Sequence, residues 1–332
     1  MATDKDISFV IPTWRGRHLL EAYLPSVFAA ADTYRKKCGT NVEIVIVEDA
    51  GGDDTPAWLE SHYKDKVRLI EHTRNSGFPI ACQTGFKAAR YPIVILLNND
   101  VRLDPDCAEP LAEALADPSV FAVTGKIFNQ KGDSFCNGGK IARFRRGMWS
   151  TYENYDILPE TRYDLPLLSF TAIGAFSAFD RAKLLEVGGF DPLTPMVEDV
   201  ELSYRAWKRG WLIKYEPKSI AYHDASQTMD KRYERRSLYM ISRRSRILMH
   251  WMLLHDRHMF CSHVAFLAAR FLTSWIVLDW RFYWAIFTGL ANLSKIISKR
   301  RATRRTMVRS DAELLKMLKQ FYGSAPIVVR KV

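Results

Sequence analysis

Residues 93–100 have the sequence IVILLNND, in which five apolar residues are followed by two amides and one carboxylate. A short apolar run rich in β-branched residues that stops at a cluster of turn-forming residues is typical of a strand buried on both faces. Open α/β sheets bind their ligands outside the carboxyl ends of such strands. We therefore expect a buried strand over residues 93–97 whose end presents Asp100 to a ligand.

Similar apolar runs precede this one, and helical patterns lie between and after them. The runs cover residues 7–11, 42–47 and 67–71, and the helical patterns cover residues 17–37, 56–64, 78–90 and 105–116. Strands that alternate with helices predict an α/β fold with a mostly parallel sheet covered by helices on both faces. The residues that directly follow the strands are candidates for ligand contact: Pro12, Thr13, Glu48, Asp49, Asn75, Asn98 and Asn99.

Beyond residue 116 the pattern is less regular. Residues 124–170 show no steady period, and we expect a mobile loop there that covers the site. Regular structure is expected further on, as a small-residue strand over residues 171–179, a helix over about 198–209, and strands over 211–215 and 219–223. The last strand ends at His223, where a neutral imidazole would complete a metal site, although a lone His at a strand end is more often structural.

The pattern changes to helices after residue 225, so we expect an α/β domain over residues 1–225 and a basic, amphipathic helical region over residues 226–332. The net charge of the chain is +11, and its basic clusters lie mainly in the second part, at residues 231–236, 243–246 and 299–305. Helical spacing predicts one strongly basic helix face made of Arg232, Arg236, Arg243, Arg246 and His250.

Residues 259–293 are rich in Phe, Trp, Leu and Ile, but Arg270, Asp279 and Arg281 interrupt them. We expect helices that lie in the interface of an anionic membrane rather than a segment that spans it. An ordinary helical subdomain packed on the α/β domain is an equally open interpretation. A last helix is expected to begin at a capping box formed by Ser310 and Glu313 and to bury three apolar side chains, Leu314, Leu318 and Phe321.

Composition and missing motifs exclude several classes of protein. With 48% hydrophobic and 26% charged residues the chain can bury a full core, so it is not a disordered or fibrous protein. The sequence lacks HExxH, GxSxG, GxxxxGK and GxGxxG, which argues against zinc hydrolases, serine hydrolases, P-loop enzymes and nicotinamide-dependent Rossmann enzymes. The basic charge alone suggests nucleic acid, but no motif that reads nucleic acid is present. The five cysteines form no CxxC pair and the N-terminus is polar, so we expect a cytoplasmic compartment and no signal peptide.

Three acidic sites carry the candidate chemistry. Asp100 would hold Mg²⁺ or Mn²⁺ against a diphosphate, because such ions need few protein ligands, although Asn-Asn-Asp also suits a turn. Glu48 and Asp49 would accept hydrogen bonds from a base or ribose, but acidic residues beside two glycines also form turns and helix caps. Glu198 and Asp199 open a helix, where a carboxylate is commonly a cap.

The order of these motifs resembles that of the family 2 glycosyltransferases, a large inverting group with the GT-A fold, and the resemblance covers roughly residues 7–225. The motifs that carry it lie at residues 10–13, 47–55, 75–85, 96–100, 188–191 and 198–205. The Asn-Asn-Asp variant and the helical tail are similar to those of rhamnosyltransferase-like members. One departure is that Asn98 replaces the first Asp of the family's DxD motif, so metal binding would rest on Asp100.

The resemblance implies an enzyme that moves a sugar from a nucleoside-diphosphate-sugar donor to a hydroxyl of a glycan or lipid-linked acceptor. It implies bacterial-type polysaccharide assembly at the cytoplasmic face of the cell membrane. It also implies that Asp199, with Glu198 beside it, is the general base and that Asp100 and His223 hold the Mg²⁺ or Mn²⁺. The residues implied to contact the donor are Pro12, Thr13, Glu48, Asp49, Asn75, Gly77, Asn98 and Asn99. A non-catalytic nucleotide-sugar or glycan-binding module with the same fold is the alternative.

Overall fold

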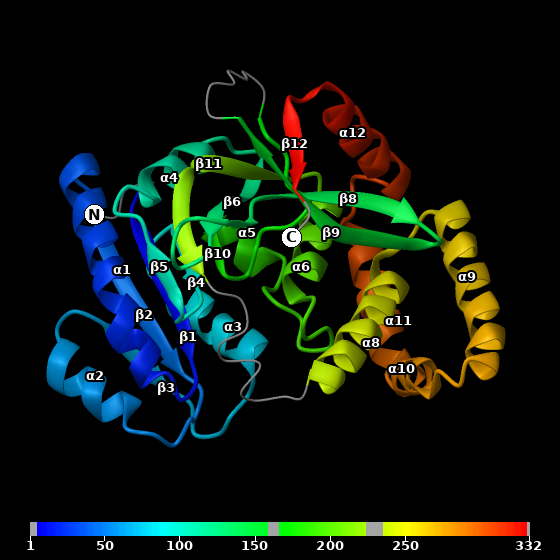
Figure 1. Ribbon diagram of the computed structural model, residues 1–332, viewed down its shortest axis with the longest axis horizontal. Coiled ribbons are helices and arrows are strands. Elements are labelled where there is room, and N and C mark those ends of the chain that lie inside the picture. The colour runs from blue at the N-terminus through cyan, green and yellow to red at the C-terminus, as the bar shows by residue number, and fades with distance from the viewer. Residues whose placement is uncertain (1–4, 159–165, 224–234, 331–332) are drawn as a thin grey trace.

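The computed structural model describes residues 5–158, 166–223 and 235–330. Figure 1 shows a curved sheet flanked by helices, with the C-terminal helices gathered on one side of it. The strands of the sheet are β1 (Ile7–Thr13), β2 (Val42–Glu48), β3 (Arg68–Glu71), β4 (Ile93–Leu97), β5 (Val101–Leu103), β6 (Val120–Phe128), β7 (Phe135–Asn137), β10 (Phe176–Asp180) and β11 (Leu212–His223). The helices of this part are α1 (Arg17–Cys38), α2 (Thr55–Tyr63), α3 (Phe78–Ala88), α4 (Ala108–Leu115), α5 (Arg181–Glu186) and α6 (Glu198–Lys208).

The sheet order over the described residues is β3-β2-β1-β4-β10-β6-β11-β5, with β7 paired to β6. β1 pairs in parallel with β2 and β4, whereas β10 runs antiparallel between β4 and β6. The predicted α/β fold, with a mostly parallel sheet and flanking helices, is therefore confirmed. Two details differ, because the strand expected over residues 171–179 begins only at Phe176, and the two strands expected over 211–223 form one strand with an irregularity after Glu216.

Successive residues of β1 enter different hydrophobic cores. Ile7, Phe9 and Ile11 pack with α1 on one face of the sheet. Val10 packs on the other face, in the core that contains Phe86 of α3. Since the sheet is covered on both faces, every residue of β1 is buried, and this is why its sequence is mostly apolar, with Ser8 as the one polar residue before Thr13.

The prediction of a loop over residues 124–170 is wrong for most of this stretch. β6 extends to Phe128, and β8 (Gly139–Arg145) and β9 (Met148–Ile157) pair as a hairpin. Its two turn residues, Arg146 and Gly147, have φ of 50° and 69°, the left-handed values that suit a tight hairpin turn. Residues 159–165 of the expected loop lie outside the described residues.

The C-terminal region is helical, as predicted. Its elements are α8 (Arg235–Leu253), α9 (Arg257–Ile276), α10 (Trp280–Leu290), α11 (Leu293–Thr306), α12 (Asp311–Ser324) and β12 (Ile327–Arg330). β12 pairs with β9, so the end of the chain joins the β8–β9 hairpin in a second sheet. The predicted capping box at Ser310 is present, and the predicted side chains of α12 are buried. The domain boundary expected between residues 225 and 226 lies outside the described residues. Arg232, which was expected on the basic helix face, also lies outside them.

A buried carboxylate attaches the C-terminal helices to the α/β part. Asp311, at the start of α12, is fully buried. It accepts hydrogen bonds from the Tyr204 hydroxyl and the Lys208 ammonium of α6. It also accepts hydrogen bonds from the backbone N–H groups of His255 and Asp256, both at 2.7 Å. One side chain therefore connects α6, α12 and the turn between α8 and α9.

The basic face expected on α8 does not include His250, because that side chain is fully buried. Its Nε2 accepts a hydrogen bond from the backbone N–H of Trp149 at 2.8 Å, and its ring stacks on that of His263, with the ring centres 5.1 Å apart. His263 in turn donates from Nδ1 to the carbonyl oxygen of Gly147 at 2.8 Å. Two histidines thus fix the β8–β9 hairpin to α8 and α9.

These histidines make stability depend on pH. Burial lowers the pKa of His250 to about 3 and that of His263 to about 4. Both folded-state values lie below the unfolded value, so the unfolded chain takes up protons first and stability falls as the pH drops from about 6.5 towards about 4. At pH ~5 each histidine is expected to cost about 2 kcal/mol of stability.

His263→Gln is therefore expected to remove about 2 kcal/mol of the stability lost between pH ~7.5 and pH ~5. The measurement is urea unfolding at both pH values. His258→Gln is the matched control, because His258 is an exposed histidine on the same helix. An equal pH dependence in the wild type and His263→Gln would contradict the prediction.

By length and composition, α9 is a helix that is long enough and apolar enough to cross a membrane, and only 17% of its apolar window is buried. This helix still contains Arg270, so the expectation that residues 259–293 lie in a membrane interface stays a prediction. Other kinds of helix also meet these criteria of length and composition, so the criteria do not assign α9 to a membrane.

Candidate active site

A cavity of about 470 Å³ lies at the carboxyl ends of β1, β2 and β4. Most of the predicted site residues line it: Pro12, Thr13, Asp49, Gly77, Asn98, Asn99, Asp100, Glu198, Asp199 and His223. Glu48 and Asn75 do not line it. The cavity is where parallel α/β sheets place their ligands, and the strands bring residues together that lie far apart in the sequence.

The floor of the cavity is held by a contact between the ends of β1 and β4. Asn99 Nδ2 donates a hydrogen bond to Thr13 Oγ1 at 2.8 Å, and both side chains are buried. Gly16 packs directly against this pair, since a Cβ atom there would lie 2.0 Å from Thr13 Oγ1. Only glycine fits this position, which holds the start of α1 close to the floor.

Asp49 organises the loop that enters α3. Its carboxylate accepts hydrogen bonds from the backbone N–H groups of Ser76 at 2.8 Å and Gly77 at 2.7 Å. His72 Nδ1 lies 2.8 Å from Asp49 Oδ1, while the other ring nitrogen lies 2.9 Å from the Thr84 hydroxyl. Asp49 is 3% exposed, so much of its hydrogen-bonding capacity is used in shaping the wall next to Gly77.

The two predicted residues outside the lining have local structural contacts. Glu48 Oε1 accepts a hydrogen bond from the Gly51 backbone N–H at 2.7 Å and closes the turn after β2, and burial raises the pKa of its carboxyl. Asn75 Nδ2 donates to the carbonyl oxygen of Asp49 at 2.9 Å. Both side chains support the loops whose neighbouring residues reach the cavity.

Asp100 and His223 meet because β5 and β11 pair antiparallel, which places His223 opposite Val101. His223 Nε2 lies 3.1 Å from Asp100 Oδ1, within ion-pair distance. Neither atom has a hydrogen-bond partner of acceptable geometry among the described residues, and the buried Asn98 Oδ1 also lacks one. Two buried atoms that lie this close beside a cavity without a hydrogen bond suit a shared cation.

The chemistry of this donor set fits Mg²⁺ or Mn²⁺ held by few protein groups. An imidazole nitrogen and a carboxylate oxygen both suit Mn²⁺, and Asp100 also suits Mg²⁺. The described residues contain no group of three or more His, Cys, Asp or Glu side chains that could hold a metal ion. The remaining ligands would therefore be phosphate oxygens of a bound donor and water.

Glu198 and Asp199 face the cavity from the first turn of α6. Burial and the neighbouring Asp199 charge raise the pKa of Glu198 to about 8, so this carboxyl is largely protonated at neutral pH. Burial also raises the pKa of Asp199, but the Val200 N–H and the charge of Lys140 work in the opposite direction. Two adjacent carboxyls in different environments can therefore serve as a neutral acid and an ionised base.

The backbone before this pair is held in an uncommon conformation. Met196 lines the cavity with φ of 70°, in the left-handed region that residues with side chains rarely adopt. Such a conformation often occurs at a functional site, where the surrounding structure enforces it. It turns the chain from Pro195 directly into α6 and places the two carboxyls at the cavity wall.

Several lining residues were not expected from the sequence. Trp14 follows β1 directly, Phe78 opens α3, and Leu238 with Ile241 reach the cavity from α8. The position of Trp14 after a strand was an available signal. Nothing local in the sequence of α8 indicates that its apolar residues complete a cavity built mainly by residues more than a hundred positions earlier.

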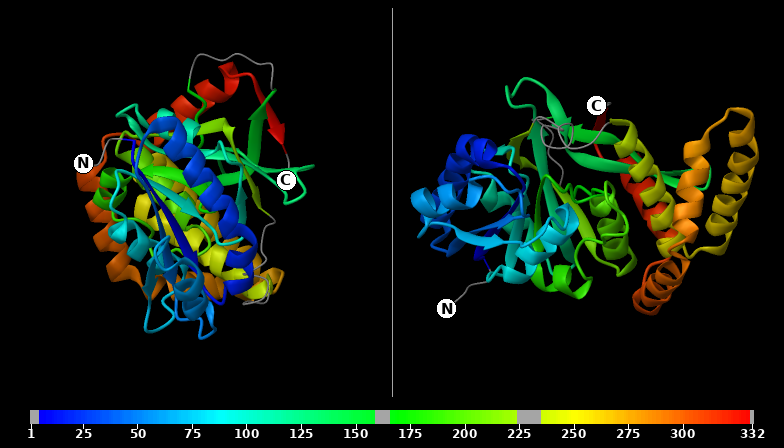
Figure 2. Two further views of the ribbon diagram at one scale, coloured as in Figure 1. Left: turned by 90° about the vertical axis from the view of Figure 1, so that its left-hand side faces the viewer. Right: turned by 90° about the horizontal axis from the view of Figure 1, so that it is seen from below.

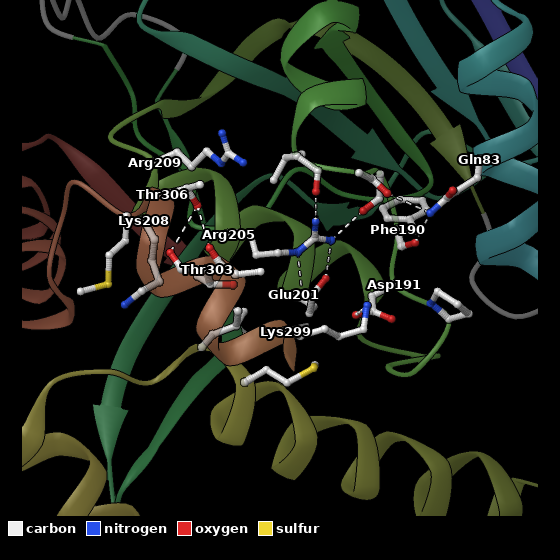
Figure 3. A pocket seen from close by; sticks show the side chains of 18 residues that line it. Gln83, Phe190, Asp191, Glu201, Arg205, Lys208, Arg209, Lys299, Thr303 and Thr306 are labelled. Atoms are coloured by element: carbon white, nitrogen blue, oxygen red, sulfur yellow. Dashed lines mark hydrogen bonds and ion pairs between the residues drawn. The ribbon is translucent and has the colours of Figure 1, made fainter. Parts of the chain in front are cut away.

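A second cavity, of about 290 Å³, lies between the turn at residues 187–192, α6 and α11 (Figure 3). Its charged side chains are paired with one another or with neighbours. Arg205 binds the Glu201 carboxylate at 2.6 Å, and Lys299 of α11 binds Asp191 at 2.8 Å. None of the predicted site residues lines this cavity, and its ion pairs connect the α/β part to the C-terminal helices.

Comparison with protein families and curated proteins gives consistent matches. Residues 8–188 match the family model of Glycosyl transferase family 2. Among curated proteins, the chain is 28% identical over 238 residues to the poly-beta-1,6-N-acetyl-D-glucosamine synthase of Staphylococcus aureus (strain COL), which covers 69% of this chain. The chain spans about half the length of that relative, 52%.

Comparison with solved structures supports the fold. The S. aureus TarS structure in complex with UDP-GlcNAc superposes with a TM-score of 0.54 at 15% identity, covering 96% of this chain and 91% of TarS. The mannosyltransferase PcManGT from Pyrobaculum calidifontis, in complex with GDP-Man and Mn²⁺, has a TM-score of 0.51 at 17% identity, covering 90% of this chain and 85% of PcManGT. At this level of identity the likeness concerns the fold alone.

Proposed function

Because the chain belongs to glycosyl transferase family 2, we propose that it transfers a sugar from a nucleoside-diphosphate-sugar donor to a hydroxyl of a glycan or lipid-linked acceptor, with inversion. The observation that carries this proposal is one cavity lined both by the Asp100–His223 pair and by the Glu198–Asp199 pair. The first pair suits a donor diphosphate with its cation, and the second supplies an acid and a base for the acceptor side.

In the proposed mechanism Asp199 accepts the proton of the acceptor hydroxyl, which attacks the anomeric carbon from the face opposite the leaving diphosphate. Glu198, largely protonated at neutral pH, lies beside Asp199 in the same wall, and its buried Oε2 has no hydrogen-bond partner among the described residues. Asp49, Gly77, Pro12 and Thr13 shape the donor side of the cavity. Mg²⁺ or Mn²⁺, held by Asp100 and His223, would supply positive charge that stabilises the departing diphosphate.

Relatives indicate where a donor search should begin. One relative is named for poly-N-acetylglucosamine synthesis, and TarS was solved with UDP-GlcNAc. UDP-GlcNAc is therefore the first donor to test, followed by other UDP-sugars, GDP-mannose and dTDP-sugars. The measurement is release of nucleoside diphosphate with Mn²⁺ or Mg²⁺ and a panel of glycan acceptors. Tight donor binding without diphosphate release from any donor would favour the alternative of a non-catalytic nucleotide-sugar or glycan-binding module.

Asp100→Ala is expected to weaken metal-dependent donor binding by about tenfold to a hundredfold, because the carboxylate is the main anionic ligand available to the cation. The measurement is calorimetry of donor binding with and without Mn²⁺. Asp106→Ala is the matched control, since it removes an exposed carboxylate that pairs with Lys37. If neither Mn²⁺ nor Asp100→Ala changed the donor affinity, the proposed role of Asp100 as a metal ligand would be contradicted.

We place this activity in bacterial-type polysaccharide assembly at the cytoplasmic face of the cell membrane, with no nucleic-acid partner. The bacterial polysaccharide synthase among the relatives supports the pathway class. All five cysteines are free thiols, which suits a reducing compartment. We also propose that residues 1–225 form the catalytic domain and residues 226–332 a helical region that completes its cavity through Leu238 and Ile241.

A further inference from the structure

The helices α9 and α10 expose an apolar surface where they join. We call this surface the apolar tip; it consists of Phe271, Leu272, Trp275, Ile276, Val277, Leu278 and Trp280, which are 41% to 78% exposed. The right-hand view of Figure 2 shows α9 projecting beyond the rest of the molecule. Single exposed apolar residues are ordinary, but a contiguous group of this kind marks an interaction surface.

The apolar tip is held in place rather than loose. Asp279, in the turn between the two helices, binds Arg243 of α8 and Arg270 of α9, both at 2.8 Å. Leu278 has φ of 51°, a strained value for a bulky residue, and its side chain is 78% exposed. The structure therefore holds an exposed leucine side chain in a strained turn.

The charge beside the apolar tip is positive. Arg243 and Arg270 lie beside it and share one acidic partner, Asp279. The Arg281 guanidinium lies 5.9 Å from the centre of the Trp280 ring. An apolar surface with a positively charged neighbour is complementary to a bilayer that has anionic headgroups above an apolar interior.

From the apolar tip and the arginines beside it, we infer that this region docks the protein on an anionic lipid bilayer. Trp275 and Trp280 have rings with an apolar body and a polar N–H, which suit the headgroup boundary. A symmetric contact between two copies through the same surface would bring Arg270 and Arg281 of both copies into one interface, where like charges repel. The bilayer is therefore the occupant that the charge favours.

The docking surface is linked to the cavity through a single helix. α8 contributes Leu238 and Ile241 to the cavity wall and Arg243 to the turn at the apolar tip. In this respect the inference rests on the proposed function, because docking would bring the cavity near a lipid-linked acceptor. Membrane docking itself is measured without turnover, so the two proposals fail separately.

The experiment is flotation of the full chain with vesicles of phosphatidylcholine alone or of phosphatidylcholine and phosphatidylglycerol at about three to one, in about 0.1 M salt. The first variant, Trp275→Ser with Ile276→Ser, removes two side chains that are 74% and 78% exposed. The second, Arg281→Gln, removes one positive charge next to Trp280. The control, Val329→Ser, removes an exposed apolar side chain of β12 that is 45% exposed and lies outside the apolar tip.

The wild type and the control are expected to float with the anionic vesicles. The apolar-tip variant is expected to lose at least about tenfold in vesicle affinity, and the charge variant about fivefold on anionic vesicles only, because a basic residue near such a surface contributes about a factor of five. Thermal unfolding of each variant checks that the fold is kept.

Three results would overturn the inference. One is a wild type that stays at the bottom of the gradient with anionic vesicles. Another is an apolar-tip variant that folds normally and floats as the wild type does. The third is a dimer, detected by light scattering, that the apolar-tip variant converts to a monomer without any change in flotation, since a second copy would then cover this surface. Absence of diphosphate release with every donor would affect the proposed function and leave the docking result unchanged.

Discussion

Asp199→Asn is expected to lower the rate of diphosphate release by about a hundredfold to ten-thousandfold while leaving donor affinity nearly unchanged. Asparagine has almost the same shape and can keep the contact with the Gly174 backbone N–H at 3.4 Å, but it cannot take the proton of an acceptor hydroxyl. The loss therefore belongs to the chemical step. It is measured by steady-state turnover with the identified donor and by calorimetry of donor binding.

Glu198→Gln is the matched variant, because it changes the adjacent carboxyl. Glu198 is largely protonated at neutral pH, so a neutral amide replaces a neutral acid and a much smaller loss of turnover is expected. In the wild type, burial raises the pKa of Asp199, so turnover should begin to fall with acidification at a higher pH than an exposed Asp would give. Near-normal turnover of Asp199→Asn would show that another group is the base.

Asp311→Ala is expected to lower the free energy of unfolding by about 3–5 kcal/mol. The substitution leaves the Lys208 ammonium buried without its carboxylate and removes the acceptor of the His255 and Asp256 backbone N–H groups. Breaking one partner of a buried charged pair costs more than the pair contributes, because the remaining charge stays out of water. Urea unfolding at neutral pH measures the change.

Glu313→Ala provides the comparison for this prediction. Glu313 lies in the same first turn of α12, but it is part of an exposed capping box with Ser310, so its loss is expected to cost much less than the loss of Asp311. A combined Lys208→Met and Asp311→Leu variant should recover much of the stability, since no buried charge is left unpaired. A loss below about 1 kcal/mol for Asp311→Ala would mean that water reaches Lys208.

The central strands could be predicted because their signal is local. β1, β2 and β4 are largely buried on both faces, so each appears in the sequence as a mainly apolar run, interrupted only by Ser8 in residues 7–11 and by Glu43 in residues 42–47. The β8–β9 hairpin lacks that signal. Its strands mix polar and aromatic residues, and its turn uses Arg146 and Gly147 rather than the Asn-Gly or Asp-Gly pair that marks such turns most clearly.

The sequence predicted which residues lie at the candidate site, but it did not predict how their side chains are arranged. A carboxylate after a buried strand points to the sheet edge, and Asp100 lies there. His223 Nε2 lies 3.1 Å from Asp100 Oδ1 because β11 pairs antiparallel with β5, and no local sequence pattern predicts this pairing. The difference in pKa between Glu198 and Asp199 likewise depends on Lys140 of β8, within the stretch expected to be a loop.

The part of the cavity wall formed by α8 has a consequence for modular exchange. The family match ends at residue 188, whereas Leu238 and Ile241 come from a helix well beyond it. A chimera that transplants only the matched segment would carry Asp49, Gly77 and Asp100, but it would take the equivalents of Asp199, His223 and α8 from its host. We therefore expect acceptor preference to depend on the C-terminal helices. Relatives that share a donor could then differ in their acceptors through changes in α8 alone.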